Sequence, residues 1–459
     1  MRGFVFMFFV GSAFAASPLP PQSPAKTLGV STFASRLCHG SVTPWEDGRI
    51  RQDEYVLWSR HDPHARSFQT LLDEKSKAIA KKLNLPKPAH ETQECLDCHT
   101  HSVPPARRGE GYAVTDGIQC EACHGPAERW IQSHVEKDAK RSESLARGLY
   151  PTRNPTRRAE LCMSCHFGNE QKLVTHRMMA AGHPRLAFEF DTFTHLQPAH
   201  YGGARGAAGA EGLSDGARNW AIGQALMAQT LLELLVHPKR GRDGLFPELV
   251  LFDCHACHHP MSKARNAGAR LGVQPGAVRL NDANLLMVRH IARRVAPRDA
   301  AALADASRAL HVAIAGGNDA LVQAGRLREL LEKITPAIEK HQFTGEDLRA
   351  ILESLIADGL VDRELQGVRP ALREAGLGRP VRHAAAHPHD LVGLRLAFEE
   401  RLLQVLLALS GAGSETCTSA GQCEACQPDC TFMECGLDPV CGTSCGECGP
   451  DEECVEGSG

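Results

Sequence analysis

Aromatic side chains are scarce in this chain. They make up 5% of its 459 residues, although 42% of the residues are hydrophobic. A core built from this sequence therefore consists mainly of Leu, Val and Ala. The formal net charge is only -3, which excludes the strongly basic balance typical of nucleic-acid binding.

Long uninterrupted apolar runs are also missing from the body of the chain. The best candidate for a membrane span, residues 221–236, is interrupted by polar side chains. Near the N-terminus, Arg2 precedes a short apolar run, Phe4–Val10, and Ala13-Phe14-Ala15 has the form of a signal-peptidase site. We therefore predict a signal peptide over residues 1–15. The mature protein is expected in the periplasm or on the surface of a Gram-negative bacterium, without a transmembrane anchor.

Cysteine, in contrast, is abundant. The chain contains 18 Cys, in one group of nine between Cys38 and Cys257 and a second group of nine between Cys417 and Cys454. This content is high for a reducing cytosol and agrees with export to an oxidising compartment.

The composition changes along the chain and predicts a mainly α fold in five parts. Short helices and loops wrap around bound cofactors, and a helical bundle and a small disulfide-rich tail follow them. In the bundle, Leu327, Leu331 and Ile334 recur at helical spacing and are expected to face a core. The predicted parts are the signal peptide 1–15, a Pro/Ser-rich leader 16–30, a domain 31–265 that carries the first group of cysteines, a helical region 277–410, and an acidic Cys-rich tail 411–459.

One five-residue motif, Cys-x-x-Cys-His, occurs four times, whereas chance would give roughly 0.04 copies in a chain of this composition. Two thiols at this spacing can each add to a vinyl group of a porphyrin, and the adjacent His can then bind the iron as proximal ligand. The predicted thioether and ligand residues are Cys95, Cys98 and His99; Cys120, Cys123 and His124; Cys162, Cys165 and His166; and Cys254, Cys257 and His258.

Two other readings of these motifs remain open at this stage. Cys-x-x-Cys pairs also build zinc sites, but a zinc site does not need the His that follows every pair here. Redox-active dithiols share the same spacing, but the motif does not recur in a βαβ context. Covalently bound haem c is therefore the favoured cofactor, with at least four copies.

A fifth site is suggested by Cys38-His39-Gly40, which has the ending of the motif but lacks the first cysteine. One thioether from Cys38, with His39 as the iron ligand, would hold a fifth haem there. The alternatives are a decayed site with a free thiol, or a His39 that serves another haem.

The opposite face of each haem needs a second ligand, or stays open for chemistry. The candidates with the most distinctive surroundings are His64, His134, His176 and His183, and the last two lie seven residues apart on one predicted helical face. Surface or core roles are favoured for His101, His195, His200, His259 and His290. Thioether ligation by Met178, Met179 or Met261 is an alternative. We expect mainly His–His coordination.

The chain resembles the multihaem cytochrome c-554 family over about residues 31–265. The matching features are Trp58–Ala65, the ending His124-Gly125-Pro126 with the trailing His134, and the close spacing of the first two motifs. The resemblance implies a mostly α-helical domain whose packed haems conduct electrons, and in which one haem can lack a sixth ligand. The departures are the incomplete motif at Cys38 and the long 42- and 92-residue spacings to the third and fourth motifs.

The tail resembles Cys-rich modules on exported proteins of myxobacteria. Its nine Cys are expected to form about four disulfides, and the odd cysteine implies a free thiol or an intermolecular bond. A role of the tail as a spacer or in surface attachment is a hypothesis. An iron–sulfur or zinc cluster is the alternative for these cysteines.

The favoured function is electron transfer between other redox proteins that act as donor and acceptor. A multihaem oxidoreductase of small nitrogen or sulfur compounds, with one open iron, is the second hypothesis. A haem-bearing sensor or scaffold is the third. The absence of any Cys-x-x-Cys-Lys motif argues against a nitrite-reductase type of enzyme.

Overall fold

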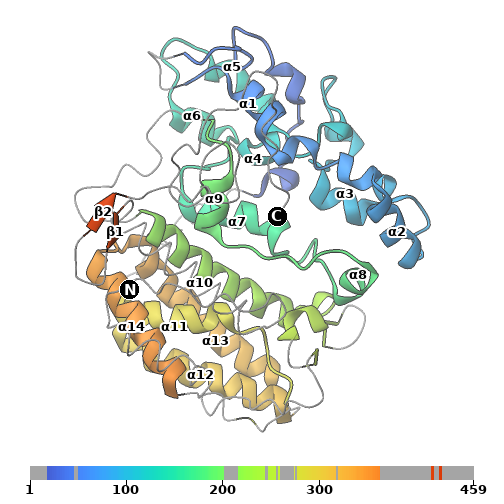
Figure 1. The fold of residues 1–459 in the computed structure, drawn as a ribbon. Helices are drawn as coiled ribbons and strands as arrows, with labels where there is room; N and C mark the ends of the chain where they lie inside the picture. The colour runs from blue at the N-terminus through green and yellow to red at the C-terminus, as the bar shows by residue number, and fades with distance from the viewer. Residues whose placement is uncertain are drawn as a thin grey trace, which may run out of the picture.

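Helices dominate the computed structural model (Figure 1), as the mainly α prediction requires. The structure describes residues 18–361 except 46–49, 201–214, 243–246, 255–256, 259–272, 274–276 and 317–318, together with 415–417 and 423–425. Within these residues, no helix is both long enough and apolar enough to span a membrane. The predicted signal peptide and most of the predicted tail lie outside the described residues.

The first half of the chain consists of short helices joined by loops and 3-10 turns. Its α-helices are α1 Glu54–His61, α2 Glu74–Lys82, α3 Gln93–His99, α4 Cys120–His124, α5 Ile131–His134, α6 Arg141–Ala146, α7 Pro155–His166, α8 His176–Ala181 and α9 Phe190–Leu196. Its 3-10 helices are η1 Pro20–Gln22, η2 Val30–Thr32, η3 Pro63–Arg66, η4 Gln69–Leu72, η5 Ala89–Glu91, η6 Pro105–Arg107, η7 Val114–Asp116 and η8 Ala127–Arg129. Two further 3-10 helices, η9 Arg240–Arg242 and η10 Leu249–Leu251, lie later in the chain.

Local capping explains several of these helix boundaries. The Asp73 carboxylate accepts a hydrogen bond from the Ser76 amide at the start of α2 (2.6 Å). The Asn154 side chain caps α7 in the same way, immediately before Pro155. Gly182 ends α8 with φ of +119°, a left-handed conformation that glycine adopts without a steric penalty.

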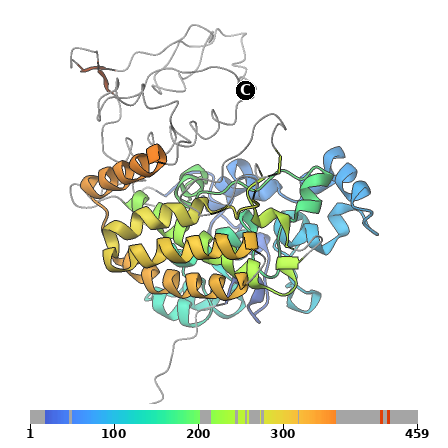
Figure 2. The same cartoon turned by 90° about the horizontal axis from the view of Figure 1, so that it is seen from below.

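Five long helices form a bundle in the second half of the described chain. They are α10 Asp215–Val236, α11 Ala283–Val295, α12 Pro297–Gly316, α13 Ala320–Lys340 and α14 Gly345–Val361. α10 packs against α11 and α13, α12 packs against α11 and α13, and α14 packs against α11. Figure 2 shows α11 to α13 stacked side by side in yellow and orange. The predicted core positions Leu327, Leu331 and Ile334 are at most 1% exposed.

One hydrophobic core joins the bundle to the motif-bearing half of the chain. It contains Met163 of α7 and Phe190 of α9 together with the buried face of α10. Gly223 of α10 lies so close to Phe190 that an added Cβ would stand 2.7 Å from the Cβ of the phenyl side chain. α10 falls within the predicted haem domain, yet its packing makes it the central helix of the bundle.

A short antiparallel hairpin is described within the tail. β1 Glu415–Cys417 pairs with β2 Cys423–Ala425, and the register aligns Cys417 with Cys423. The part of the predicted helical region beyond residue 361 and the rest of the tail lie outside the described residues.

A buried carboxylate lies in the first turn of α14. Asp347 accepts hydrogen bonds from the Thr344 amide (2.9 Å) and from Nε of Arg294 (3.0 Å), and it lies 3.1 Å from His341 Nε2. Burial raises the pKa of Asp347, but these hydrogen bonds outweigh burial and hold the pKa well below its ordinary value of 3.8. The ionised carboxylate therefore stabilises the bundle.

Replacing this carboxylate in an Asp347→Asn variant should lower the free energy of unfolding by about 2 kcal/mol at neutral pH. Because the folded-state pKa is depressed, the contribution is present above pH 3.8 and is lost as the pH falls through the folded-state value. Urea titrations of both proteins should show a difference that shrinks below about pH 4. Exposed Glu346→Gln is the control, and a pH-independent difference would contradict the ionic role.

Candidate functional site

Three of the four motifs occupy the final turns of a helix, and each of these helices ends on the motif histidine. α3 ends at His99, α4 at His124 and α7 at His166. In the fourth motif, the His258 amide donates to the Cys254 carbonyl (2.8 Å) and closes an equivalent turn. A helical turn brings residues three and four apart to one face, so both thiols and the histidine project on the same side of each motif.

Ten histidines form five close ring pairs, and each pair joins a histidine of a motif, or His39, to one from elsewhere in the chain. The ring centroids of all five pairs are between 6.0 and 6.5 Å apart. The pairs are His39 with His134 (6.1 Å), His166 with His64 (6.0 Å), His99 with His183 (6.5 Å), His124 with His200 (6.1 Å) and His258 with His176 (6.3 Å).

Several of these rings are oriented through Nδ1. His39 Nδ1 lies 2.9 Å from a Glu54 carboxylate oxygen, and His64 Nδ1 lies 2.8 Å from an Asp62 carboxylate oxygen. Backbone carbonyl groups accept from Nδ1 of His99, His183 and His200. An Nδ1–H that donates leaves Nε2 as the acceptor, which is the nitrogen that can bind a metal.

Burial shifts the pKa values of the cysteines and histidines in the motifs. It raises the pKa of Cys120 to about 12 and that of Cys162 to about 11, so both thiols remain protonated near neutral pH. Burial, assisted by the neighbouring His200, lowers the pKa of His124 to about 4. The ring of His124 is therefore neutral, which is the form that coordinates iron.

The incomplete motif keeps one thiol and a complete histidine pair. Cys38 is held in a tight turn by a hydrogen bond from its amide to the Ser35 carbonyl (2.9 Å). The adjacent His39 stacks on His134 with 17° between the ring planes. Since the ring spacing of this pair, 6.1 Å, lies within the range of the other four, the site keeps a paired histidine although the motif lacks its first cysteine.

The first and third motifs lie next to each other. Lys172 Nζ donates to the carbonyl of Asp97 in the first motif (2.8 Å) and to Cys165 Sγ in the third (2.8 Å). The hydroxyl of Ser67 lies 2.9 Å from the carbonyl of His99 and 2.8 Å from that of His64, whose ring pairs with the third motif. The two sites therefore share their supporting contacts.

The second motif contacts the third. The Tyr150 amide donates to the carbonyl of His124 (2.8 Å), and its hydroxyl donates to the Arg157 carbonyl in α7 (2.8 Å). The amide of Ile118, just before the second motif, donates to the carbonyl of His64 (3.0 Å). Tyr150 and Ile118 therefore connect α4 to the site of the third motif.

The second motif is also joined to the site at Cys38. The Glu121 carboxylate of α4 accepts from the amides of Gly29 (2.7 Å) and Ala127 (2.7 Å), which ties the N-terminal segment to this helix. His134, the partner of His39, lies on α5, ten residues after His124. The sites of His39 and His124 are therefore neighbours.

The first and fourth motifs meet through α8. His176 is the first residue of α8 and pairs with His258, whereas His183 pairs with His99. The prediction that these two histidines share one helical face is wrong, because α8 ends at Ala181 and His183 lies beyond the Gly182 turn. This turn is what directs the two rings to different motifs.

His200, for which the sequence favours a surface or core role, is the ring partner of His124. With His39 counted, the sequence contains five proximal histidines but offers only four distal candidates, and this shortage is the signal that one more ligand is needed. His101 is fully buried, and neither ring nitrogen has a hydrogen-bond partner among the described residues. His290 is buried in the bundle beside Ser354, and His195 lies near Asp191.

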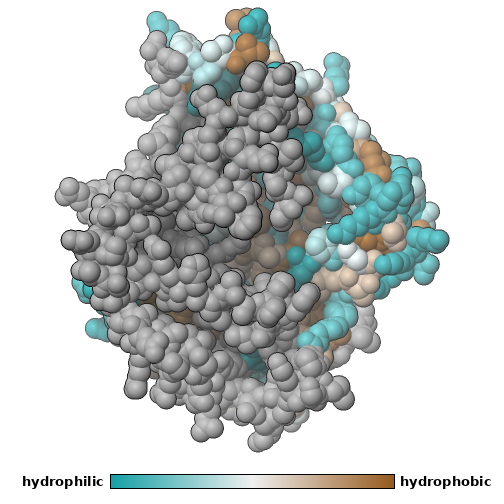
Figure 3. Space-filling model, viewed as in Figure 1, coloured by the Kyte–Doolittle hydropathy of each residue, from teal (hydrophilic) through white to brown (hydrophobic). Residues whose placement is uncertain are grey.

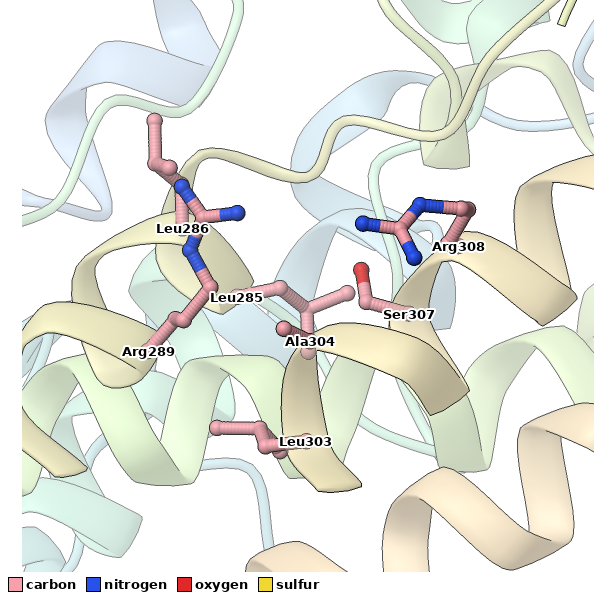
Figure 4. A pocket seen from close by; sticks show the side chains of 7 residues that line it. All are labelled: Leu285, Leu286, Arg289, Leu303, Ala304, Ser307 and Arg308. Atoms are coloured by element: carbon pink, nitrogen blue, oxygen red, sulfur yellow. The ribbon is translucent and has the colours of Figure 1, made fainter. Parts of the chain in front are cut away.

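The remaining residues considered as second iron ligands do not join a histidine pair in the described part of the chain. Met178 packs with Leu83 and Val174 in a small hydrophobic cluster, while Met261 and His259 lie outside the described residues. Among the residues described, no three His, Cys, Asp or Glu side chains form a group able to hold a metal ion. A small pocket between α11 and α12, lined by Leu285 and Arg289 among others, belongs to the bundle (Figure 4).

A comparison with protein families supports the class indicated by these motifs, the c-type cytochromes, which bind haem covalently and transfer electrons. Residues 36–125 match the family described as cytochrome c554 and c-prime. The predicted resemblance is thereby confirmed for this segment, which spans the Cys38 site and the first two motifs. No curated protein and no solved structure matches the chain.

Proposed function

We propose that the chain is an exported electron-transfer protein with five haem c sites, each enclosed by two histidines. Cys95 and Cys98, Cys120 and Cys123, Cys162 and Cys165, and Cys254 and Cys257 would hold four haems through two thioethers each. Cys38 alone would hold the fifth. The iron ligands would be His39 and His134, His99 and His183, His124 and His200, His166 and His64, and His258 and His176.

The single observation that carries this proposal is the common spacing of the five ring pairs. A metal–imidazole bond is about 2 Å long and the ring centre lies about 1 Å further out, so two imidazoles on one iron have centres about 6 Å apart. The observed range of 6.0 to 6.5 Å agrees with this value in five pairs formed by different segments of the chain. The donor set therefore fits bis-histidine haem.

Two histidines per iron favour electron transfer over catalysis. A bound haem supplies a one-electron couple between ferric and ferrous iron, and an iron with two protein ligands has no position left for a substrate. The chain offers a partner for every proximal histidine. The carrier is therefore preferred to an oxidoreductase with one open iron.

The contacts between sites support a serial arrangement. Glu121 and α5 link the sites of His39 and His124, Tyr150 links those of His124 and His166, and Lys172 links those of His166 and His99. α8 adds the site of His258 beyond that of His99. We propose that electrons pass along this order, and that the two ends, at His39 and His258, face other redox proteins.

The remaining parts of the proposal concern the ends of the chain. Residues 1–15 direct export to the periplasm or the cell surface and are then removed. The Cys-rich tail forms disulfides, with its odd thiol available for attachment to another molecule.

The carboxylate beside His64 should lower the reduction potential of that haem. An Asp62→Asn variant should raise this potential by about 60 mV, a tenfold change for a one-electron couple, because a carboxylate on Nδ1 makes the ligand more basic and favours ferric iron. A redox titration followed by electron paramagnetic resonance measures it. Glu54→Gln is the matched variant, because Glu54 lies beside His39. If both variants shifted the reduction potential of the same haem, the assignment of His64 and His39 to different haems would be wrong.

The test of the function combines a haem count with a spin-state measurement on the mature protein. We expect a mass increase of five haems and only low-spin ferric signals. A strong high-spin signal that changes on adding nitrite or hydroxylamine would instead favour the oxidoreductase. A mature protein without covalent haem would overturn the proposal.

A further inference from the structure

Large apolar side chains are exposed around the site of His39 and His134. Eleven large hydrophobic residues are strongly exposed among the described residues, and five of them lie directly beside these histidines or in the loop after His39. They are Leu37 (89% exposed), Val135 (64%), Val42 (61%), Trp45 (55%) and Ile50 (50%). Figure 3 shows hydrophobic surface at the top of the molecule, the end where α5 lies in Figure 1.

Backbone hydrogen bonds hold this apolar group next to the site. The Tyr55 amide donates to the carbonyl of His39 (2.9 Å), which fixes the start of α1 against the histidine. The Ser41 amide donates to the Gln52 carbonyl (2.8 Å), so the loop that bears Trp45 begins and ends beside His39. We call Leu37, Val42, Trp45, Ile50 and Val135 the apolar patch.

Basic side chains are concentrated in the segment of the chain that contains His134 and Val135. Residues 129–153 contain six Lys and Arg but only three Asp and Glu. Lys137 and Lys140 lie two and five residues after Val135 and are exposed, and neither has an ion-pair partner in the described part of the chain. We call the basic residues of this segment the basic rim.

An apolar centre beside a charged rim is the composition of a transient docking surface. Isolated exposed hydrophobics need no explanation, but a group of them marks an interaction site. Electron-transfer encounters bury small areas, and charges at their rims steer association more than they add affinity. The apolar patch also lies at one end of the proposed series of sites, where an external redox partner must approach.

We propose that the apolar patch and the basic rim dock an acidic redox protein whose exposed cofactor edge has apolar surroundings. This inference rests on the proposed function, because it takes the site of His39 and His134 as the point of electron exchange. The apolar contacts set the distance between the two cofactors, and the basic rim selects a partner of negative charge.

A flavodoxin, which is acidic and exchanges electrons through an exposed flavin edge, serves as the probe. Its hydroquinone gives one electron to a ferric haem of the complete mature protein and becomes the semiquinone, while the haem becomes ferrous. Stopped-flow absorbance measures this rate. We expect the wild-type rate to fall at least tenfold as sodium chloride increases from low to high concentration.

Two variants test the two parts of the surface. Trp45→Asp replaces an apolar side chain of the patch by a negative charge, which would repel an acidic partner. Lys137→Glu with Lys140→Glu changes two positive charges of the basic rim to negative ones. Each should slow reduction about tenfold. The matched controls are Val322→Asp, an equally exposed apolar residue on α13, and Lys75→Glu with Lys82→Glu on α2; both should stay within about twofold of the wild type.

The haem content of each protein, measured by mass, separates this inference from the proposed function. If the wild type lacks a haem at Cys38, the proposed fifth site fails. If all haems are present but reduction is slow and salt-independent, or the patch and control variants react equally fast, the docking surface is wrong.

Discussion

A Cys38→Ala variant is expected to lose one covalent haem of five. In the proposed site, Cys38 provides the only thioether, so no covalent bond would remain between that haem and the chain. The mass of the mature protein under denaturing conditions measures the loss directly. The visible spectrum should fall in proportion, because the other four sites do not depend on this thiol.

Cys95→Ala provides the matched control for this result. The first motif keeps Cys98, which can hold its haem by one thioether just as Cys38 is proposed to do, so this variant should retain all five haems. An unchanged mass after Cys38→Ala would show that no haem is attached there. The pair of His39 and His134 would then need another explanation.

A His64→Ala variant should convert one haem from low spin to high spin. His64 is the ring partner of His166 at 6.0 Å, and its removal leaves that iron with one protein ligand and an open position. Electron paramagnetic resonance should show a new high-spin signal from one haem of five. The ferrous protein should also gain the ability to bind carbon monoxide.

His61→Ala is the control, because His61 is exposed at the end of α1 only three residues away. It should leave every haem low-spin. If His64→Ala also produced no high-spin signal, the pairing of His64 with His166 would be wrong, and so would the general rule that ring spacing identifies the iron ligands.

The sequence was most informative where the chemistry is local. The thiol and histidine spacing within each motif needs one helical turn, and α3, α4 and α7 supply it. The bundle core was predictable for the same reason, since Leu327 and Leu331 recur with the helical period and are fully buried.

The pairing of histidines was much harder to predict, because it depends on contacts between distant segments. Nothing in the local pattern distinguishes His200, which pairs with His124, from His101, which is buried and whose ring nitrogens have no hydrogen-bond partner in the described part of the chain. Similarly, a seven-residue spacing suggested one helical face for His176 and His183. The Gly182 turn, a tertiary detail, separates their directions.

The distance along the chain between paired histidines bears on how such a protein matures. His99 precedes His183, and His39 precedes His134, by roughly eighty to a hundred residues, and the other three pairs are similarly spaced. If the chain crosses a membrane from its N-terminus, the first histidine of each pair therefore emerges well before the second. In the proposed protein, the thioethers at Cys38, in the first motif and in the second motif would hold three haems on the emerging polypeptide until their distant histidines follow. The third and fourth motifs emerge after their partners His64 and His176, so both axial ligands of those haems are present at attachment.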